Sequence, residues 1–196
     1  MGGVLSSPKK LHFRLVEGHG VDNTSLSLAG RGEAKKVPKL KKILIGWEEW
    51  CALPDLGLPA VKAKIDTGAK TSALHAENIE VFNRGGQDFV RFEIPPLKKK
   101  EDLVVTCEAP LADERAVISS NGEREKRFVI NTQIEFAGKI FNAEVTLTSR
   151  HKMTFRMLLG RDALKKAQVA VDPAKSFVLG KPPGVVKLYK NVLKEE

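Results

Sequence analysis

The chain has 196 residues, 42% of them hydrophobic, which is enough for one domain of ordinary size with its own core. No run approaches the roughly 20 apolar residues of a membrane-spanning helix, so no membrane association is expected. The two cysteines, Cys51 and Cys107, are too few for a disulfide framework, and a reducing cytoplasmic location is the default.

The net charge of +9 is concentrated at the two ends of the chain. Residues 1–42 hold nine basic and three acidic residues, residues 181–196 hold four and two, and the middle holds twenty and nineteen. A basic tail can add sequence-independent affinity for nucleic acid or a ribosome, whereas a solvated, flexible extension is the simpler alternative. We predict a disordered basic N-terminal extension over 1–41, a folded domain over 42–180 and a basic C-terminal tail over 181–196.

Short apolar or alternating runs separated by turn signals predict a chain of strands. Gly85-Gly86 and Asn121-Gly122 are hairpin signals, and one short helix is expected over 161–166. Strands do not alternate with long helices, so we predict an all-β, closed barrel-like domain rather than a parallel α/β sheet. The predicted strands cover residues 43–47, 60–65, 79–82, 89–94, 103–108, 116–118, 128–130, 134–136, 140–147, 155–159, 169–171 and 176–179.

The functional site is expected at the end of the strand over 60–65, where Asp66, Thr67 and Gly68 follow the apolar run. These residue types favour a tight turn, because Gly68 can take a positive φ and the two polar side chains can bind local backbone amides. A carboxylate at the mouth of a buried strand is costly to leave ionised and unpaired. Catalysis would explain it, and an ordinary turn that closes a strand is the alternative.

A second signal is the apolar-apolar-Gly-Arg segment at 158–161, which precedes the predicted helix. Together with K-I-D-T-G-A-K-T-S-A-L-H at 64–75 it resembles the retropepsin-like aspartic proteases, and in particular the bacterial RimB-like family. That family has often carried the label "ATP-dependent zinc protease".

The resemblance implies a single acid-protease lobe with one short helix after Leu-Leu-Gly-Arg and a flap that covers the substrate. Asp66 would be the catalytic acid. Only one Asp-Thr-Gly occurs, so the second carboxylate of an aspartic protease would have to come from a symmetric homodimer. Supporting roles are implied for Thr67, Gly68, Ala69, Gly160 and Arg161.

The substrate side of the predicted site is formed by Lys70, Thr71 and His75. Retroviral members have an acid where this chain has Lys70, so the usual acid–arginine brace with Arg161 is absent. These two cations would suit carboxylates on a peptide substrate, although Lys70 can equally point to solvent. His75 could line the cleft, and a packed or solvent-facing histidine is the alternative.

Neither zinc nor ATP finds support in the sequence. It has no His-Glu-x-x-His, four histidines in all, and no Gly-x-x-x-x-Gly-Lys-Ser/Thr loop. No metal and no cofactor are therefore expected.

The function expected from the resemblance is that of a dimeric aspartic endopeptidase which trims glutamate-rich tails, such as those of a ribosomal protein. The alternative is a non-catalytic binding module of the same fold that recruits a partner through its basic ends.

Overall fold

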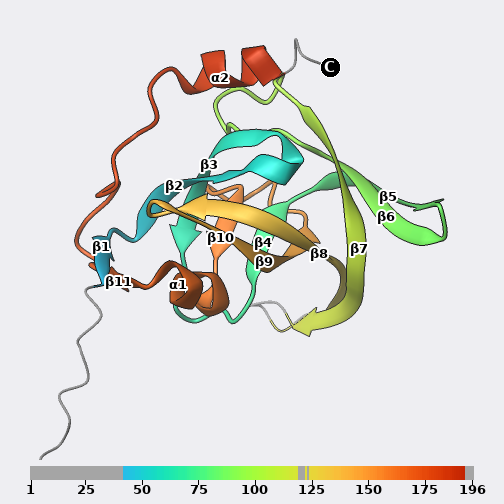
Figure 1. Cartoon of the computed structure of the whole chain (residues 1–196), viewed down its shortest axis with the longest axis horizontal. Coiled ribbons are helices and arrows are strands. Elements are labelled where there is room, and N and C mark those ends of the chain that lie inside the picture. The colour runs from blue at the N-terminus through green and yellow to red at the C-terminus, as the bar shows by residue number, and fades with distance from the viewer. Residues whose placement is uncertain (1–41, 119–121, 123, 193–196) are drawn as a thin grey trace, which may run out of the picture. The chain divides into compact units, whose positions relative to one another are not determined.

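A computed structural model describes residues 42–118, 122 and 124–192, and the predicted N-terminal extension lies outside these residues (Figure 1). Strands dominate the described chain, as predicted. The helical segments are the 3-10 helix η1 (Pro54–Leu56), α1 (Arg161–Ala167) and α2 (Val185–Val192). The strands are β1 (Ile43–Ile45), β2 (Glu48–Leu53), β3 (Leu58–Ile65), β4 (Ser72–His75), β5 (Glu77–Arg84), β6 (Gln87–Ile94), β7 (Val105–Ile118), β8 (Arg124–Phe136), β9 (Lys139–Thr148), β10 (Met157–Leu159) and β11 (Val169–Val171).

Nine strands form one sheet in the order β2-β3-β10-β4-β9-β8-β7-β6-β5. Strand β2 also pairs with β8, through Ala52 and Glu135, and this pairing joins the first six strands of the order into a ring. The predicted all-β class is therefore confirmed. The β5–β6 hairpin projects away from the ring on the right of Figure 1, and β1 pairs with β11 in a separate parallel pair.

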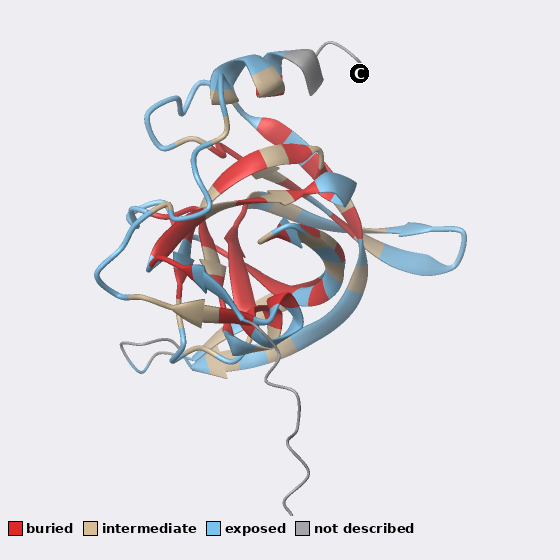
Figure 2. Cartoon of the chain, turned by 60° about the vertical axis from the view of Figure 1, so that its left-hand side comes forward, coloured by how far each residue is buried: buried red, intermediate tan, exposed pale blue. Residues whose placement is uncertain are grey.

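The core cluster combines residues of the ring strands with residues of β6, β7, α1 and α2, and the buried segments are red in Figure 2. Its largest apolar members are fully buried, and each contributes about 1.5–3 kcal/mol through removal of apolar surface from water. They include Phe92, Phe136, Leu53, Leu58, Leu74, Ile130, Ile134 and Leu147.

Several strand predictions need correction. Strand β2 was not predicted, and β7 and β8 each run unbroken where two short strands were expected. Residues 176–179 form no strand, because the buried carboxylate of Glu49 accepts hydrogen bonds from the amides of Val178 and Leu179 at 2.8 and 3.3 Å. Strand β11 pairs only with β1 and does not join the main sheet. Strand β4 was missed because all four of its residues are buried, which removes the alternation that a half-exposed strand shows.

The domain also extends past the predicted boundary at residue 180. Helix α2, which crosses the top of Figure 1, was not predicted, so α1 is not the only helix of the described chain. The Tyr189 side chain of α2 is fully buried and donates from its hydroxyl to the Ala60 carbonyl oxygen at 2.7 Å. None of the described helices is long and apolar enough to cross a membrane.

Candidate active site

Asp66 lies directly after β3, and its backbone amide donates to the Leu159 carbonyl oxygen of β10 at 2.9 Å. One carboxylate oxygen, Oδ1, accepts from the amides of Gly68 and Ala69 at 2.9 and 3.1 Å. These two backbone donors fix the position of the carboxylate oxygen. The side chain is half-buried and Thr67 and Gly68 are exposed, so the acid is presented at a surface.

Gly68 does not have the positive φ that was expected of it. Its small size has a different consequence. A Cβ atom at this position would come within 3.1 Å of Asp66 Oδ1, the oxygen that the Gly68 amide binds. The glycine therefore lets the backbone approach the carboxylate closely.

Gly160 packs against the segment that follows the acid turn. A Cβ atom there would lie 2.7 Å from the carbonyl carbon and oxygen of Thr71 and 2.8 Å from the Lys70 carbonyl oxygen. The Gly160 amide donates to the hydroxyl of the buried Ser72 at 3.2 Å. This contact joins the beginning of β4 to the end of β10.

Arg161 holds the turn through its carbonyl oxygens. Its Nη1 donates to the carbonyl oxygens of Thr67 and Gly68 at 3.1 and 2.6 Å. The amides of Arg161 and Asp162 donate to the carbonyl oxygens of Ala69 and Lys70 at 2.9 and 3.1 Å. The beginning of α1 thus binds four consecutive carbonyl groups of the acid turn, and this replaces the acid–arginine brace that the sequence lacks.

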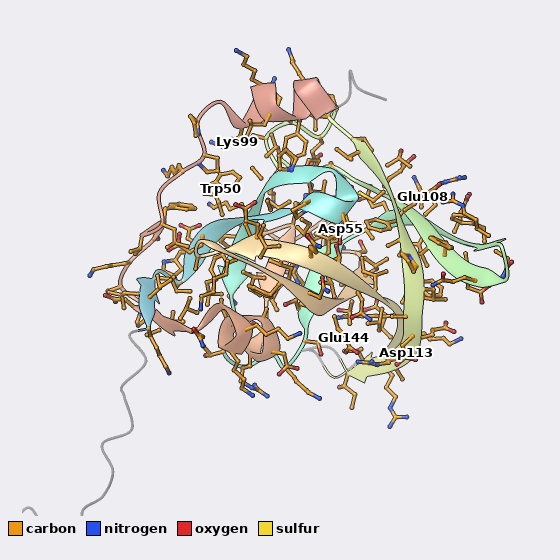
Figure 3. The ribbon with its side chains drawn as sticks, in the orientation of Figure 1. Trp50, Asp55, Lys99, Glu108, Asp113 and Glu144 are labelled. Atoms are coloured by element: carbon orange, nitrogen blue, oxygen red, sulfur yellow. The ribbon has the colours of Figure 1, made fainter. Side chains whose placement is uncertain are left out.

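Two of the predicted substrate-binding residues, Lys70 and Thr71, lie near Glu144. Lys70 is exposed and forms no ion pair within the described part of the chain, although its charge acts on Glu144. Glu144 lies close to Asp113 in Figure 3, and Arg115 binds both carboxylates. Thr71 is half-buried and borders a surface hollow of about 480 Å³ with Glu144.

His75 does not line an open cleft, because its side chain is fully buried, so the packed alternative holds. Its Nδ1 accepts a hydrogen bond from the Arg150 amide at 2.9 Å. Its Nε2 lies 3.0 Å from Glu77 Oε1, though without good hydrogen-bond geometry. Burial, followed by the charge of Arg156, lowers the pKa of His75 below its ordinary value, while Glu77 acts in the opposite direction.

His75, Glu77 and His151 place three potential ligand atoms within 4.8 Å of one another, so we tested them as a metal site. A backbone amide can only donate, so Nδ1 of His75 carries the lone pair and the ring proton lies on Nε2. The nitrogen that faces Glu77 and His151 is therefore the protonated one, and a metal ligand must be unprotonated. These residues do not fit a metal ion.

The sequence analysis missed two cations near Asp66. Lys64 is exposed on β3, two residues before Asp66. Arg150, which follows β9, is buried, and the charge of Asp66 acts on it. Strand alternation could have revealed Lys64, whereas nothing in the local pattern around Arg150 indicates its position.

This fold and this turn define an all-β protein of the retropepsin-like class, with one acid-Thr-Gly turn in the chain. The family described as "RimB-like: Retropepsin-like aspartic endopeptidase RimB" matches residues 44–182. The chain belongs to the RimB-like family.

Among solved structures, a Legionella pneumophila protein described as being of unknown function has a similar fold, with a TM-score of 0.60 and 31% identity. The similarity covers 70% of this chain and 98% of that one. Proteins named "Probable alpha-L-glutamate ligase" from Shewanella pealeana and Desulfotalea psychrophila are 48% and 46% identical over 139 and 141 residues. These matches cover 71% and 72% of this chain but only 30% of each relative.

Proposed function

We propose that this chain is an aspartic peptidase that hydrolyses a peptide bond with Asp66 from each of two subunits. The observation that carries the proposal is the Asp66 turn. Two amides hold its carboxylate, α1 binds its carbonyl oxygens, and its tip is exposed rather than sealed in the core. Such rigid support is what a catalytic group needs in order to keep a productive geometry.

The chemistry requires two carboxylates that share one proton around a water molecule. The ionised carboxylate takes a proton from the water as its oxygen attacks the scissile carbonyl carbon. The protonated carboxylate donates its proton to the carbonyl oxygen. Collapse of the tetrahedral intermediate breaks the C–N bond, and the leaving nitrogen receives a proton. One subunit supplies one Asp66, so the dimer axis would pass between the two turns.

The surface beside the turn supports such an assembly. Thr67 and Arg161 border a hollow of about 550 Å³ that Leu164, Val169 and Val171 line with apolar side chains. On the adjoining β1, Ile43 and Leu44 are exposed by 36% and 45%. Apolar surface next to an incomplete site is what a second copy of the chain could cover.

The proposed substrate is a glutamate-rich peptide, such as the tail of a ribosomal protein. The ligase relatives carry a region similar to this chain inside a much longer protein whose name refers to glutamate. Cations near the acid turn, with Lys70 and Lys64 among them, are compatible with an acidic substrate. The ligase name covers a whole protein of which this chain matches 30%, so ligation is not proposed for it.

The decisive experiment is mass spectrometry of a glutamate-tailed peptide after incubation with the unsubstituted protein and with Asp66→Asn. We expect shortened products from the former only. Asp66→Asn keeps the acceptor oxygen, so circular dichroism and sedimentation should show an unchanged fold and assembly. Equal processing by both proteins would exclude the proposed mechanism. Partner binding that needs residues 1–40 and not Asp66 would favour the non-catalytic binding module.

A further inference from the structure

The β5–β6 hairpin leaves an open strand edge at one end of the sheet. Strand β5 is the last of the nine strands, and in the described part of the chain it pairs only with β6. Figure 2 shows the projecting part of this hairpin as exposed. An edge strand presents unpaired amide and carbonyl groups, so another extended chain can pair with it.

Two residues of this edge, Val81 and Asn83, direct their backbone groups outward. The hairpin turns over the glycines at 85–86, which both have positive φ, and Arg84 pairs with Gln87 across this turn. The pair that closes a two-residue turn is hydrogen-bonded, and hydrogen-bonded pairs alternate with non-hydrogen-bonded pairs along an antiparallel ladder. The amide and carbonyl groups of Val81 and Asn83 therefore point away from β6.

Side-chain contacts on one face of the hairpin hold it in shape. The rings of Phe82 and Phe89 stack with their centroids 5.7 Å apart, and Cζ of Arg84 lies 5.2 and 5.0 Å from these centroids. Cζ of Arg91 lies 5.2 Å from the Phe82 centroid. Arg84 and Arg91 also bind Glu108 of β7, at 2.6 and 2.8 Å. The hairpin is therefore a braced arm with a preformed edge, which reduces the ordering cost of binding.

The arginines of the arm are bound within it, and this leaves its edge acidic. Arg91 lies opposite Glu80 of β5 on one side and Glu108 of β7 on the other, and it binds Glu108. Glu80 is exposed and forms no ion pair with any described residue. Residues 77–94 hold four acidic and two basic residues in a protein of net charge +9, and both basic residues bind Glu108.

We infer that the free edge of β5 is a docking site for an extended, basic segment of a partner protein, which adds to the sheet as a further strand. The backbone of this segment would bind the outward groups of Val81 and Asn83, and a lysine or arginine opposite Glu80 would form a cross-strand charge pair. An apolar side chain of the segment would cover Val81, which is 47% exposed. A second β5 edge carries the same excess of acid, so charge favours a basic segment over self-pairing.

The probe is a short peptide in which lysine alternates with valine, blocked at both ends, and the matched peptide has glutamate in place of lysine. Binding to the full chain is measured by titration calorimetry at one fixed ionic strength, because salt screens exposed charges. Hydrogen exchange followed by NMR reports on individual amides. We expect the lysine peptide to bind, the glutamate peptide not to bind, and the amides of Val81 and Asn83 to become protected when the lysine peptide is bound.

Two substitutions test the edge and its charge separately. Val81→Pro removes an outward amide and keeps the hydrogen bonds between β5 and β6, so it should weaken binding of the lysine peptide by about tenfold. Glu80→Lys should weaken it by about fivefold or more. Glu135→Lys is the matched control, since Glu135 is also exposed on a strand and has no ion pair among the described residues. Thermal unfolding is recorded for each variant, and if Val81→Pro does not fold, Glu80→Lys and the exchange data still decide the matter.

The docking site is disproved if the lysine peptide does not bind, or if it binds without protecting the amides of Val81 and Asn83. Equal binding by Glu80→Lys and the unsubstituted protein would also overturn it. Protection that rises with protein concentration in the absence of peptide would identify a second copy of the chain as the occupant instead. The site does not use Asp66, so Glu80→Lys should cleave a glutamate-tailed peptide as the unsubstituted protein does.

Discussion

Arg161 donates from its guanidinium to the Gly68 carbonyl oxygen at 2.6 Å, which connects residues 93 positions apart. The same nitrogen reaches the Thr67 carbonyl oxygen. Both acceptors lie in the turn whose amides hold the Asp66 carboxylate, since the Gly68 amide binds Oδ1. Helix α1 therefore fixes the acid indirectly, by fixing the peptide groups that bind it.

Replacing this arginine tests that connection. Arg161→Lys keeps the charge and loses the planar group that reaches two carbonyl oxygens. Because Arg161 is exposed, we expect only about 1 kcal/mol of lost stability. The loss of peptide cleavage should be larger, about tenfold or more, because small displacements of a catalytic group are costly. Chemical denaturation and kcat/KM measure the two effects, and Arg84→Lys is the matched control.

A second prediction concerns the close contact between Gly160 and Thr71. In Gly160→Ala the new Cβ would lie 2.7 Å from backbone atoms, which cannot rotate away. We expect a loss of about 1–3 kcal/mol in the free energy of unfolding, together with reduced cleavage. Gly86→Ala is the control for cleavage, because the added atom meets nothing within 4 Å, although the positive φ of Gly86 still costs some stability. If both variants cleave equally well, the contact does not position the acid turn.

Much of this site could be predicted from the sequence because its parts are local. The turn at Asp66 follows an apolar run, and the glycine at 160 precedes a helix start, so each leaves a pattern in neighbouring residues. These patterns indicated the turn and the helix start, whereas the roles of Asp66, Gly160 and Arg161 were implied by the resemblance to the retropepsin-like family. The structure brings the three residues together. The close approach at Gly68 was not predictable, because it depends on the distance between an added Cβ atom and a carboxylate oxygen.

The parts that were not predicted depend on long-range contacts. In the sequence Tyr189 lies in the predicted basic tail. Only the packing of α2 against β3 shows that it belongs to the core. His75 and Arg150 are joined by one hydrogen bond across 75 positions of the chain, with no periodicity to indicate it. Burial of such polar groups depends on partners that the local sequence does not reveal.

The buried histidine makes stability depend on pH. The pKa of His75 is lowered from 6.5 by burial and by Arg156, so the folded protein binds this proton less readily than the unfolded chain. Well above pH 6.5 the His75 ring is neutral in both the folded and the unfolded state, so it adds no pH dependence to the free energy of unfolding. As the pH falls below that value the unfolded chain takes up the proton first. The free energy of unfolding then decreases by at most about 1.4 kcal/mol per pH unit until the lowered folded pKa is reached.

Protonation of Nδ1 would also remove the acceptor for the Arg150 amide. His75→Asn keeps a short acceptor and cannot be protonated in this range, so it should reduce the pH dependence of unfolding between about pH 5 and 7. Denaturant titrations at several pH values measure the difference between the two proteins. Equal slopes would show that His75 does not titrate on unfolding.

The last prediction concerns the extent of the domain. The Tyr189 hydroxyl is buried and donates to Ala60, and desolvation raises its pKa, so it remains a neutral donor. Tyr189→Phe keeps the ring and leaves the Ala60 carbonyl oxygen without this donor, which we expect to lower the free energy of unfolding by about 1–2 kcal/mol.

Truncation after residue 180 removes the whole ring and exposes the surface of β3 that it covers, so the loss in the free energy of unfolding should reach about 3–5 kcal/mol. Val186, which is 37% exposed on the same helix, provides the control, because Val186→Ala should have almost no effect. A truncated protein as stable as the full chain would restore the boundary at residue 180 and make α2 dispensable.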